Sequence, residues 1–287
     1  MRITRNVDDL GNTGKCVAMG LFDGVHMGHQ TLVKRLVTAA RGAGGKAVVL
    51  TFDPHPLEIL NPAFAPPYLT NLEEKALLLE ALGVDDLLVL AFDASFSRLS
   101  PEAFAGGVLG RIRPYQVFIG YNFTFGHKGL GTAHTLVEMG RKHSFEVQVV
   151  DPVKYKGAVV SSTLIRDSIG QGRVELANEM LGRAYTLPGV LGKEPQGGTS
   201  LGFGPGRALP GSGVYAVRCQ AGRALDGVCL VRWPGPRILV DSLGPALPEG
   251  PARVTFLKHW RGCLPQALED RHCMWARRAL DGTPWWV

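Results

Sequence analysis

The chain has 287 residues, of which 45% are hydrophobic and 20% are charged, so a disordered protein is excluded and two domains can each bury a core. No uninterrupted apolar run is long enough to span a bilayer, which excludes a membrane-embedded chain and leads us to expect a cytoplasmic protein. Most of the net charge of +6, and all five tryptophans, lie beyond Leu187. A basic surface with aromatic side chains can bind single-stranded nucleic acid, but tryptophans in a small domain usually fill its core, so nucleic acid is not an expected partner.

Short apolar, β-branched runs alternate with segments of helical period in the first two thirds of the chain. This alternation predicts an α/β domain with a parallel sheet covered by helices. The helix expected at 72–82 has Asn71 and Glu74 in the spacing of a capping box, and Pro101 is placed to begin another. The expected strands are 17–19, 47–52, 87–92, 117–123 and 147–150.

A histidine pair follows the first of these strands. His26 and His29 lie directly before the helical pattern of 30–41, where the first backbone N–H groups of a helix attract anions. Gly28 is expected to let the backbone approach a ligand, and Gly20 to allow a tight turn. The pattern therefore predicts a phosphate-binding loop, although a turn with capping histidines is a comparable reading of these residues alone.

Two residues of this loop, Phe22 and Asp23, are expected to lie across the same site. The loop has no Gly-Lys-Ser/Thr sequence and no spaced-glycine fingerprint, so it is neither a P-loop nor a dinucleotide-binding turn. Its HxGH form resembles the nucleotidylyltransferase superfamily, whose members join a phosphate nucleophile to the α-phosphate of a nucleoside triphosphate and release pyrophosphate.

Three further loops carry polar or rigid motifs. Pro54 and Pro56 flank a histidine after the second strand and predict a rigid turn that could form a wall for a flat ring. Asn122 lies between aromatic residues after the fourth strand and offers a donor and an acceptor together. Hydroxyls and Arg166 in the sequence SSTLIR (161–166) can cap a helix, or can bind phosphate oxygens.

The character of the chain changes around 185–198, where glycine and proline occur with little periodicity. Short strand-like runs follow at 213–218, 228–233, 238–240 and 253–257, and 266–280 has helical spacing. These patterns predict a small antiparallel β-barrel with a C-terminal helix. The five cysteines contain no CxxC pair, so neither a disulfide framework nor a zinc site is expected.

The four motifs, in this order, resemble the bacterial FAD synthetases, which are usually fused to a riboflavin kinase. The resemblance implies a Rossmann-like nucleotidylyltransferase domain at 1–185 and a riboflavin-kinase-like barrel at 186–287. It implies that the FMN phosphate attacks the α-phosphate of MgATP to give FAD and pyrophosphate. ATP and FMN would be the substrates and Mg²⁺ the metal, with FAD as the product of this flavoprotein.

The resemblance also assigns residues by position. The catalytic group would be His26, His29, Asn122 and Arg166. ATP would contact Gly20, Phe22, Asp23, His26, Gly28, His29, Ser162, Thr163 and Arg166. The flavin would contact Pro54, Pro56, Asn122 and Phe125. The Mg²⁺ ligands are not assigned, although Asn122 is a possible one, and the oligomeric state is not indicated.

The barrel departs from the family it resembles. Riboflavin kinases carry a GFPTAN segment whose Thr and Asn hold MgATP, whereas residues 202–207 read GFGPGR. The catalytic Glu expected within 237–241 is absent, and Asp241 is a misplaced substitute. We therefore expect a folded barrel without riboflavin kinase activity.

Three alternatives remain open from the residues alone. One is a fully bifunctional riboflavin kinase/FAD synthetase. Another is an HxGH transferase that uses phosphopantetheine or nicotinamide mononucleotide. The last is a flavin-binding regulatory protein with a vestigial site.

Overall fold

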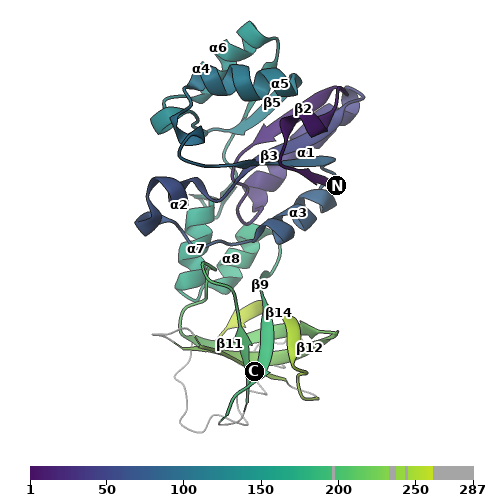
Figure 1. Ribbon diagram of the computed structural model, residues 1–287. Helices are drawn as coiled ribbons and strands as arrows, with labels where there is room; N and C mark the ends of the chain where they lie inside the picture. The colour runs from purple at the N-terminus through teal and green to yellow at the C-terminus, as the bar shows by residue number, and fades with distance from the viewer. Residues whose placement is uncertain (196–197, 233–236, 243–244, 261–287) are drawn as a thin grey trace. The chain divides into compact units, whose positions relative to one another are not determined.

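The computed structural model describes residues 1–195, 198–232, 237–242 and 245–260, and the chain divides into two compact units (Figure 1). Unit 1 comprises Met1–Pro66 and Thr70–Val160, and unit 2 comprises Pro67–Leu69 and the chain from Ser161 onward. Within the described residues, no helix has both the length and the apolar character needed to cross a membrane.

Unit 1 is built on a six-stranded sheet in the order β1-β4-β3-β2-β5-β6, and every pairing between neighbouring strands is parallel. The parallel α/β architecture predicted from the sequence is thus confirmed. The strands are β1 (Arg2–Thr4), β2 (Lys15–Met19), β3 (Lys46–Asp53), β4 (Asp86–Ala91), β5 (Pro114–Gly120) and β6 (Glu146–Val150). The three-residue edge strand β1 was not predicted, because it is short and its sequence is polar.

The helices of unit 1 occupy the connections between strands. The longer ones are α1 (Met27–Gly42), α3 (Leu72–Ala81) and α6 (Ala133–His143). The short ones are η1 (Val7–Leu10), α2 (Pro56–Leu60), η2 (Pro62–Phe64), η3 (Phe96–Arg98), α4 (Pro101–Phe104), η4 (Ala105–Leu109), α5 (Gly110–Ile112) and η5 (His127–Gly129). A small hairpin, β7 (Lys154–Tyr155) and β8 (Ala158–Val159), ends the unit.

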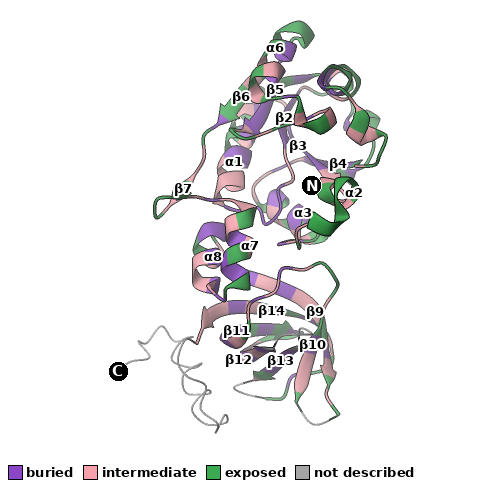
Figure 2. Cartoon of the chain, turned by 90° about the vertical axis from the view of Figure 1, so that its left-hand side faces the viewer, coloured by how far each residue is buried: buried purple, intermediate pink, exposed green. Residues whose placement is uncertain are grey.

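Both faces of the sheet are buried. Ala18 of β2 packs in one core with Leu36 of α1 and other residues of α1 and α3, whereas Met19 packs in a second core with Phe104 and Leu136 on the opposite face. Helices α1 and α3 accordingly carry buried and exposed residues side by side (Figure 2). The capping box predicted at the start of α3 is confirmed, since the Glu74 amide donates to Asn71 at 2.8 Å and the Asn71 amide donates to Glu74 at 2.9 Å.

The strand order has a switch point between β2 and β5. From β2 the chain builds outward through β3 and β4, and it then returns to the other side of β2 as β5. In open parallel sheets, ligands bind at the carboxyl ends of the strands beside such a point. The loops after β2 and β5 are the ones that carry the histidine pair and Asn122.

In its described residues, unit 2 has two helices and a closed six-stranded barrel in the order β10-β13-β12-β11-β14-β9. Every pairing in the barrel is antiparallel, which confirms the predicted architecture. Its elements are α7 (Ser162–Gly170), α8 (Val174–Leu181), β9 (Tyr185–Lys193), β10 (Thr199–Gly202), β11 (Gly213–Ala221), β12 (Arg223–Arg232), β13 (Arg237–Ser242) and β14 (Gly250–His259). Large buried side chains such as Tyr215 and Phe256 lie edge to face in its core, with ring centroids 5.5 Å apart.

The prediction of an irregular stretch around 185–198 is wrong for its first part, because Tyr185–Lys193 forms the nine-residue strand β9. Hydrogen bonds to β10 and β14 on both sides hold it extended despite its proline and glycines. Gly189 fits a close approach, since a Cβ there would lie 2.3 Å from the Gly202 carbonyl oxygen. The helix predicted at 266–280 lies outside the described residues.

Candidate functional site

The loop between β2 and α1 has an unusual backbone. Phe22 (φ 51°) and Val25 (φ 40°) adopt left-handed conformations that side chains other than glycine rarely take, and Gly24 (φ 79°) lies between them. The side chains of Phe22 and Val25 are 0% and 1% exposed, so packing holds the loop in this shape. Backbone strain of this kind concentrates at functional sites.

The two imidazoles of the HxGH sequence stack on each other at the start of α1. Their ring centroids are 3.7 Å apart with an interplanar angle of 18°, and Phe22 packs against the His29 ring at 5.2 Å. His26 is the N-cap of α1, and its Nδ1 accepts from the His29 amide at 3.4 Å. The helix therefore begins at Met27, three residues before the predicted 30–41 and inside the motif itself.

Gly28 also makes room within the histidine pair. A Cβ at this position would lie 3.1 Å from Cε1 of His26, so the glycine leaves room for the His26 ring. The close approach of a ligand to the backbone at Gly28 stays a prediction.

His29 is held in its neutral form by its surroundings. Burial, the neighbouring His26 and the ammonium of Lys75 lower its pKa well below the ordinary value of 6.5. Its Nδ1 is buried and has no hydrogen-bond partner among the described residues. A neutral imidazole with an unused polar atom can donate its single N–H to an anionic oxygen.

This lowered pKa predicts a pH dependence of stability. Between the folded-state pKa of His29 and 6.5, the unfolded chain binds a proton that the folded chain does not, so stability falls as the pH drops through this range. We expect thermal melts between about pH 7 and pH 5 to show a steeper loss for the parental chain than for His29→Gln.

A control for this measurement is His134→Gln, which changes a histidine whose side chain is 83% exposed. That variant should follow the parental curve. Equal slopes for the parental chain and His29→Gln would contradict the lowered pKa.

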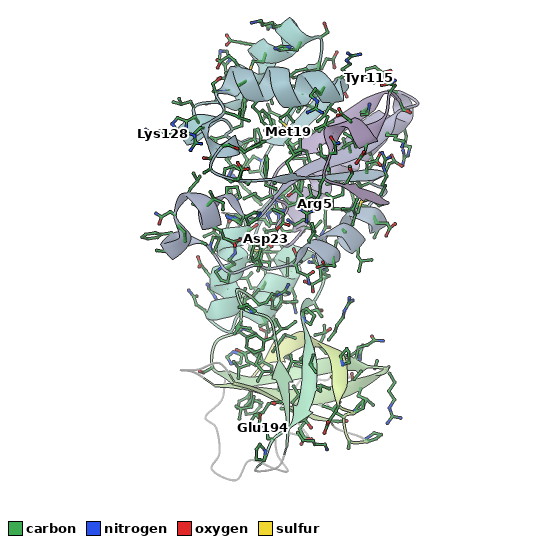
Figure 3. All side chains as sticks on the ribbon, in the orientation of Figure 1. Arg5, Met19, Asp23, Tyr115, Lys128 and Glu194 are labelled. Atoms are coloured by element: carbon green, nitrogen blue, oxygen red, sulfur yellow. The ribbon has the colours of Figure 1, made fainter. Side chains whose placement is uncertain are left out.

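Asp23 ties the loop to the start of α3. Its Oδ1 accepts from the Thr70 amide at 3.0 Å and from the Thr70 hydroxyl at 3.3 Å, and that hydroxyl accepts from the Gly24 amide at 3.0 Å. Asp23 is 3% exposed (labelled in Figure 3). The observed contacts make it an anchor of the loop.

Lys75 on α3 was missed by the sequence reasoning. It is 7% exposed, its charge contributes to the lowered pKa of His29, and its own pKa is lowered by burial against the opposing effect of Asp23 and Asp53. A signal was present, because Lys75 shares the inward stripe of α3 with the apolar residues Leu72, Ala76 and Leu79.

The proline loop after β3 is ordered by its own histidine. His55 is the N-cap of α2, where its Nδ1 accepts from the Leu57 amide at 3.1 Å and its amide donates to Glu58 at 3.2 Å. Pro54 and Pro56 are half-buried beside it. Both prolines follow β3, the neighbour of β2, and so lie at the same edge of the sheet as the histidines.

In the loop after β5, the side chain of Asn122 is exposed and the ring of Phe125 is buried. Asn122 is exposed in a turn, whereas Phe125 is 7% exposed and packs against Phe104 at 5.5 Å and Phe123 at 5.9 Å. Asn122 is thus free to meet a ligand at the switch point. Phe125 acts mainly as a support of the loop.

The SSTLIR residues begin α7 in unit 2. Ser161 is the N-cap and accepts from the Leu164 amide at 3.2 Å, while Ser162 is half-buried and Thr163 is exposed. Arg166 donates from Nε to the Pro67 carbonyl at 2.7 Å. Since these residues and the histidine pair belong to different units, their joint action on one nucleotide stays a prediction.

The residues described contain no group of three or more His, Cys, Asp or Glu side chains that could hold a metal ion. The site in unit 1 instead gathers imidazole rings, an ammonium and helix N–H groups, which suit phosphate oxygens. Phosphate oxygens and water are the usual main ligands of a nucleotide-bound Mg²⁺.

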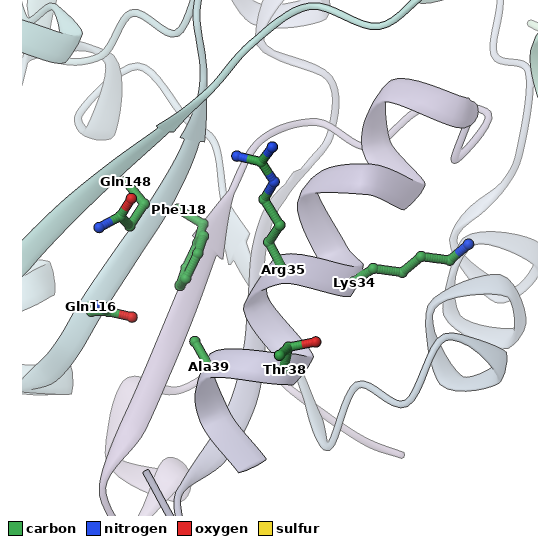
Figure 4. A pocket seen from close by; sticks show the side chains of 7 residues that line it. All are labelled: Lys34, Arg35, Thr38, Ala39, Gln116, Phe118 and Gln148. Carbon is green, nitrogen blue, oxygen red and sulfur yellow. The ribbon is translucent and has the colours of Figure 1, made fainter. Parts of the chain in front are cut away.

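A shallow pocket lies elsewhere on unit 1, between α1 and the strands β5 and β6 (Figure 4). It contains none of the predicted site residues. Its lining residues are Lys34, Arg35, Thr38, Ala39, Gln116, Phe118 and Gln148.

The comparisons with known proteins point to one family. A sequence model of FAD synthetase matches residues 9–164, more than half of the chain. A bifunctional riboflavin kinase/FMN adenylyltransferase from Listeria monocytogenes is 37% identical over 219 residues, which cover 74% of this chain and 69% of the relative. The Bacillus subtilis protein of the same name is 32% identical over 74% of this chain and 70% of its own length.

One solved structure extends the similarity to the whole fold. It is described as a macrolide-efflux protein from Streptococcus pneumoniae and is 24% identical, with a TM-score of 0.84. The match covers 98% of this chain and 97% of that one. At this identity the likeness concerns the fold alone.

Proposed function

The chain belongs to the FAD synthetase family, and on this premise we propose that its stacked histidines serve adenylyl transfer from MgATP to FMN while its barrel does not phosphorylate riboflavin. The observation that carries the first part is the half-buried His29 imidazole at the amino end of α1, whose pKa is lowered so that the ring stays neutral and whose Nδ1 has no hydrogen-bond partner among the described residues. We place the boundary between the two functions near Tyr185, where the barrel begins.

The reaction requires alignment and charge stabilisation rather than a protein nucleophile. An oxygen of the FMN phosphate forms a bond to the α-phosphorus of ATP, and the bond from that phosphorus to the pyrophosphate oxygen breaks. His26, His29 and the first amides of α1 donate to the oxygens that gain charge. Bound Mg²⁺ would neutralise part of the phosphate charge.

The other family positions fit supporting roles in this proposal. Pro54 and Pro56 form a rigid edge beside the flavin ring, and the exposed Asn122 offers its amide to the flavin or to the metal. Phe125 supports that loop from the core. Ser162, Thr163 and Arg166 bind the nucleotide from α7.

The loss of kinase activity rests on the barrel residues. Residues 202–207 lack the Thr and Asn that the kinase family uses for MgATP. Arg207, which stands in the Asn position, donates to the backbone carbonyls of Leu69 and Thr186 at 3.2 and 3.3 Å. Asp241 is exposed, while its neighbour Val240 faces the core of the barrel, so the carboxylate points away from the interior.

We predict that the purified chain, incubated with MgATP, converts FMN to FAD and leaves riboflavin unchanged. The two reactions are followed in parallel by chromatography of the flavins. Formation of FMN from riboflavin would show a bifunctional enzyme like its named relatives and would overturn the second part of the proposal. A lack of FAD from FMN would overturn the first part.

A further inference from the structure

Lys75 is a buried cation on the inner face of α3. The helix begins at the capping box of Asn71, and its inward stripe buries Ala76 and Leu79 in the core against β2 to β4. Lys75 lies on this same stripe and is 7% exposed. An ammonium in such a position is unusual, because burial of a charge is unfavourable unless the charge is paired.

The ammonium of Lys75 has no partner in the described part of the chain. It makes no hydrogen bond or ion pair there, although it lies close enough to Asp23 and Asp53 to feel their charges. Both carboxylates have closer partners, since Asp23 accepts from Thr70 and Asp53 pairs with Arg5 at 3.0 Å. Thr70 is a neutral donor, so Asp23 still compensates part of the Lys75 charge from a distance, but neither carboxylate forms an ion pair with the ammonium in the described part of the chain.

The surroundings of Lys75 indicate which kind of anion it could bind. Its charge acts on His29, whose ring stacks on His26 at the amino end of α1. This end of the helix and the histidines already favour a phosphate chain. Burial lowers the pKa of Lys75, and an approaching polyphosphate would favour the charged ammonium again.

We propose that Lys75 binds the polyphosphate chain of ATP, completing with His26 and His29 a phosphate site that draws on both α1 and α3. The proposal rests on the proposed function for the identity of the nucleotide. The binding of a polyphosphate by Lys75 is testable without it. In the absence of the anion, the buried ammonium is compensated only from a distance by Asp23 and Asp53, and in its presence the charge forms a direct contact.

The test compares Lys75→Met, which keeps the length of the side chain and removes its charge, with Lys75→Arg, which keeps the charge. Lys34→Met is the matched control, because Lys34 is exposed on the outer side of α1. Binding of pyrophosphate, ATP and AMP to the full chain is measured by calorimetry. The thermal midpoint of the free protein is recorded for each variant, as are kcat and KM for ATP and FMN.

Loss of a charge-assisted contact predicts that Lys75→Met binds pyrophosphate and ATP about 10- to 100-fold more weakly. AMP binding and the KM for FMN should stay within about twofold, since neither uses the contact. The thermal midpoint of the free Lys75→Met protein should be unchanged or raised. Lys75→Arg should retain most of the affinity, and Lys34→Met should match the parental chain.

The opposite results are equally clear. If Lys75→Met binds pyrophosphate as the parental chain does and melts at a lower temperature, or fails to fold, Lys75 is a structural cation and the proposal is wrong. If the parental chain binds pyrophosphate through Lys75 but makes no FAD, the proposed function fails while this inference stands.

Discussion

Replacing His29 by alanine is expected to reduce the turnover of FAD formation by about 10²- to 10³-fold, the loss typical of one donor to a developing oxyanion. The removed ring stacks on His26 at 3.7 Å and contacts Phe22, so the variant loses a donor and also the partner that orients the second imidazole. The loss should appear in kcat with MgATP and FMN, because the contact strengthens as charge moves onto the leaving pyrophosphate.

A control variant for this measurement is His134→Ala, which removes an imidazole that is 83% exposed on α6. It should retain parental kinetics. A second variant, His29→Asn, keeps a side-chain N–H donor and should recover part of the lost rate. FAD formation by His29→Ala at the parental rate would remove His29 from the mechanism.

Replacing Asp23 by alanine is expected to lower the free energy of unfolding of unit 1 by about 2–4 kcal/mol. The variant leaves the buried Thr70 amide and hydroxyl without their acceptor and frees the Gly20–His26 loop from α3. Because the chain has two units, a single unfolding curve would mix them. Hydrogen exchange of the β2 and α1 amides reports unit 1 alone.

The isosteric variant Asp23→Asn is the control for this prediction. Its carboxamide oxygen still accepts from the Thr70 amide, so most of the stability should return even though the charge is gone. Asp23→Ala with unchanged protection in β2 and α1 would contradict the anchoring role. FAD formation should fall in Asp23→Ala, because the loop that carries the histidine pair loses its tie to α3.

The sequence predicted the features of the fold that depend on local patterns. Strand and helix periodicity indicated the parallel sheet, and the Asn71 and Glu74 spacing indicated the start of α3 correctly. The strand β9 escaped detection because its regularity comes from hydrogen bonds to strands far away in the sequence. Its proline and glycines read locally as a loop.

The candidate site was predicted in its types of residue more than in its contacts. The motif identified His26 and His29, but the stacking of their rings and the space that Gly28 provides for it depend on three-dimensional packing. Lys75 was missed because a lysine within a helix reads as a solvated residue. Only the docking of α3 against the sheet makes it a buried charge.

The left-handed backbone at Phe22 and Val25 has a consequence for how nucleotides are received. Both side chains are sealed in the core, so the loop cannot relax to an easier conformation without pulling apolar groups into water. The loop is thus rigid before the nucleotide binds, and it loses little conformational entropy on binding. Nucleotide binding should therefore proceed without rearrangement of this loop, and calorimetry should record only a slight heat-capacity change from the protein.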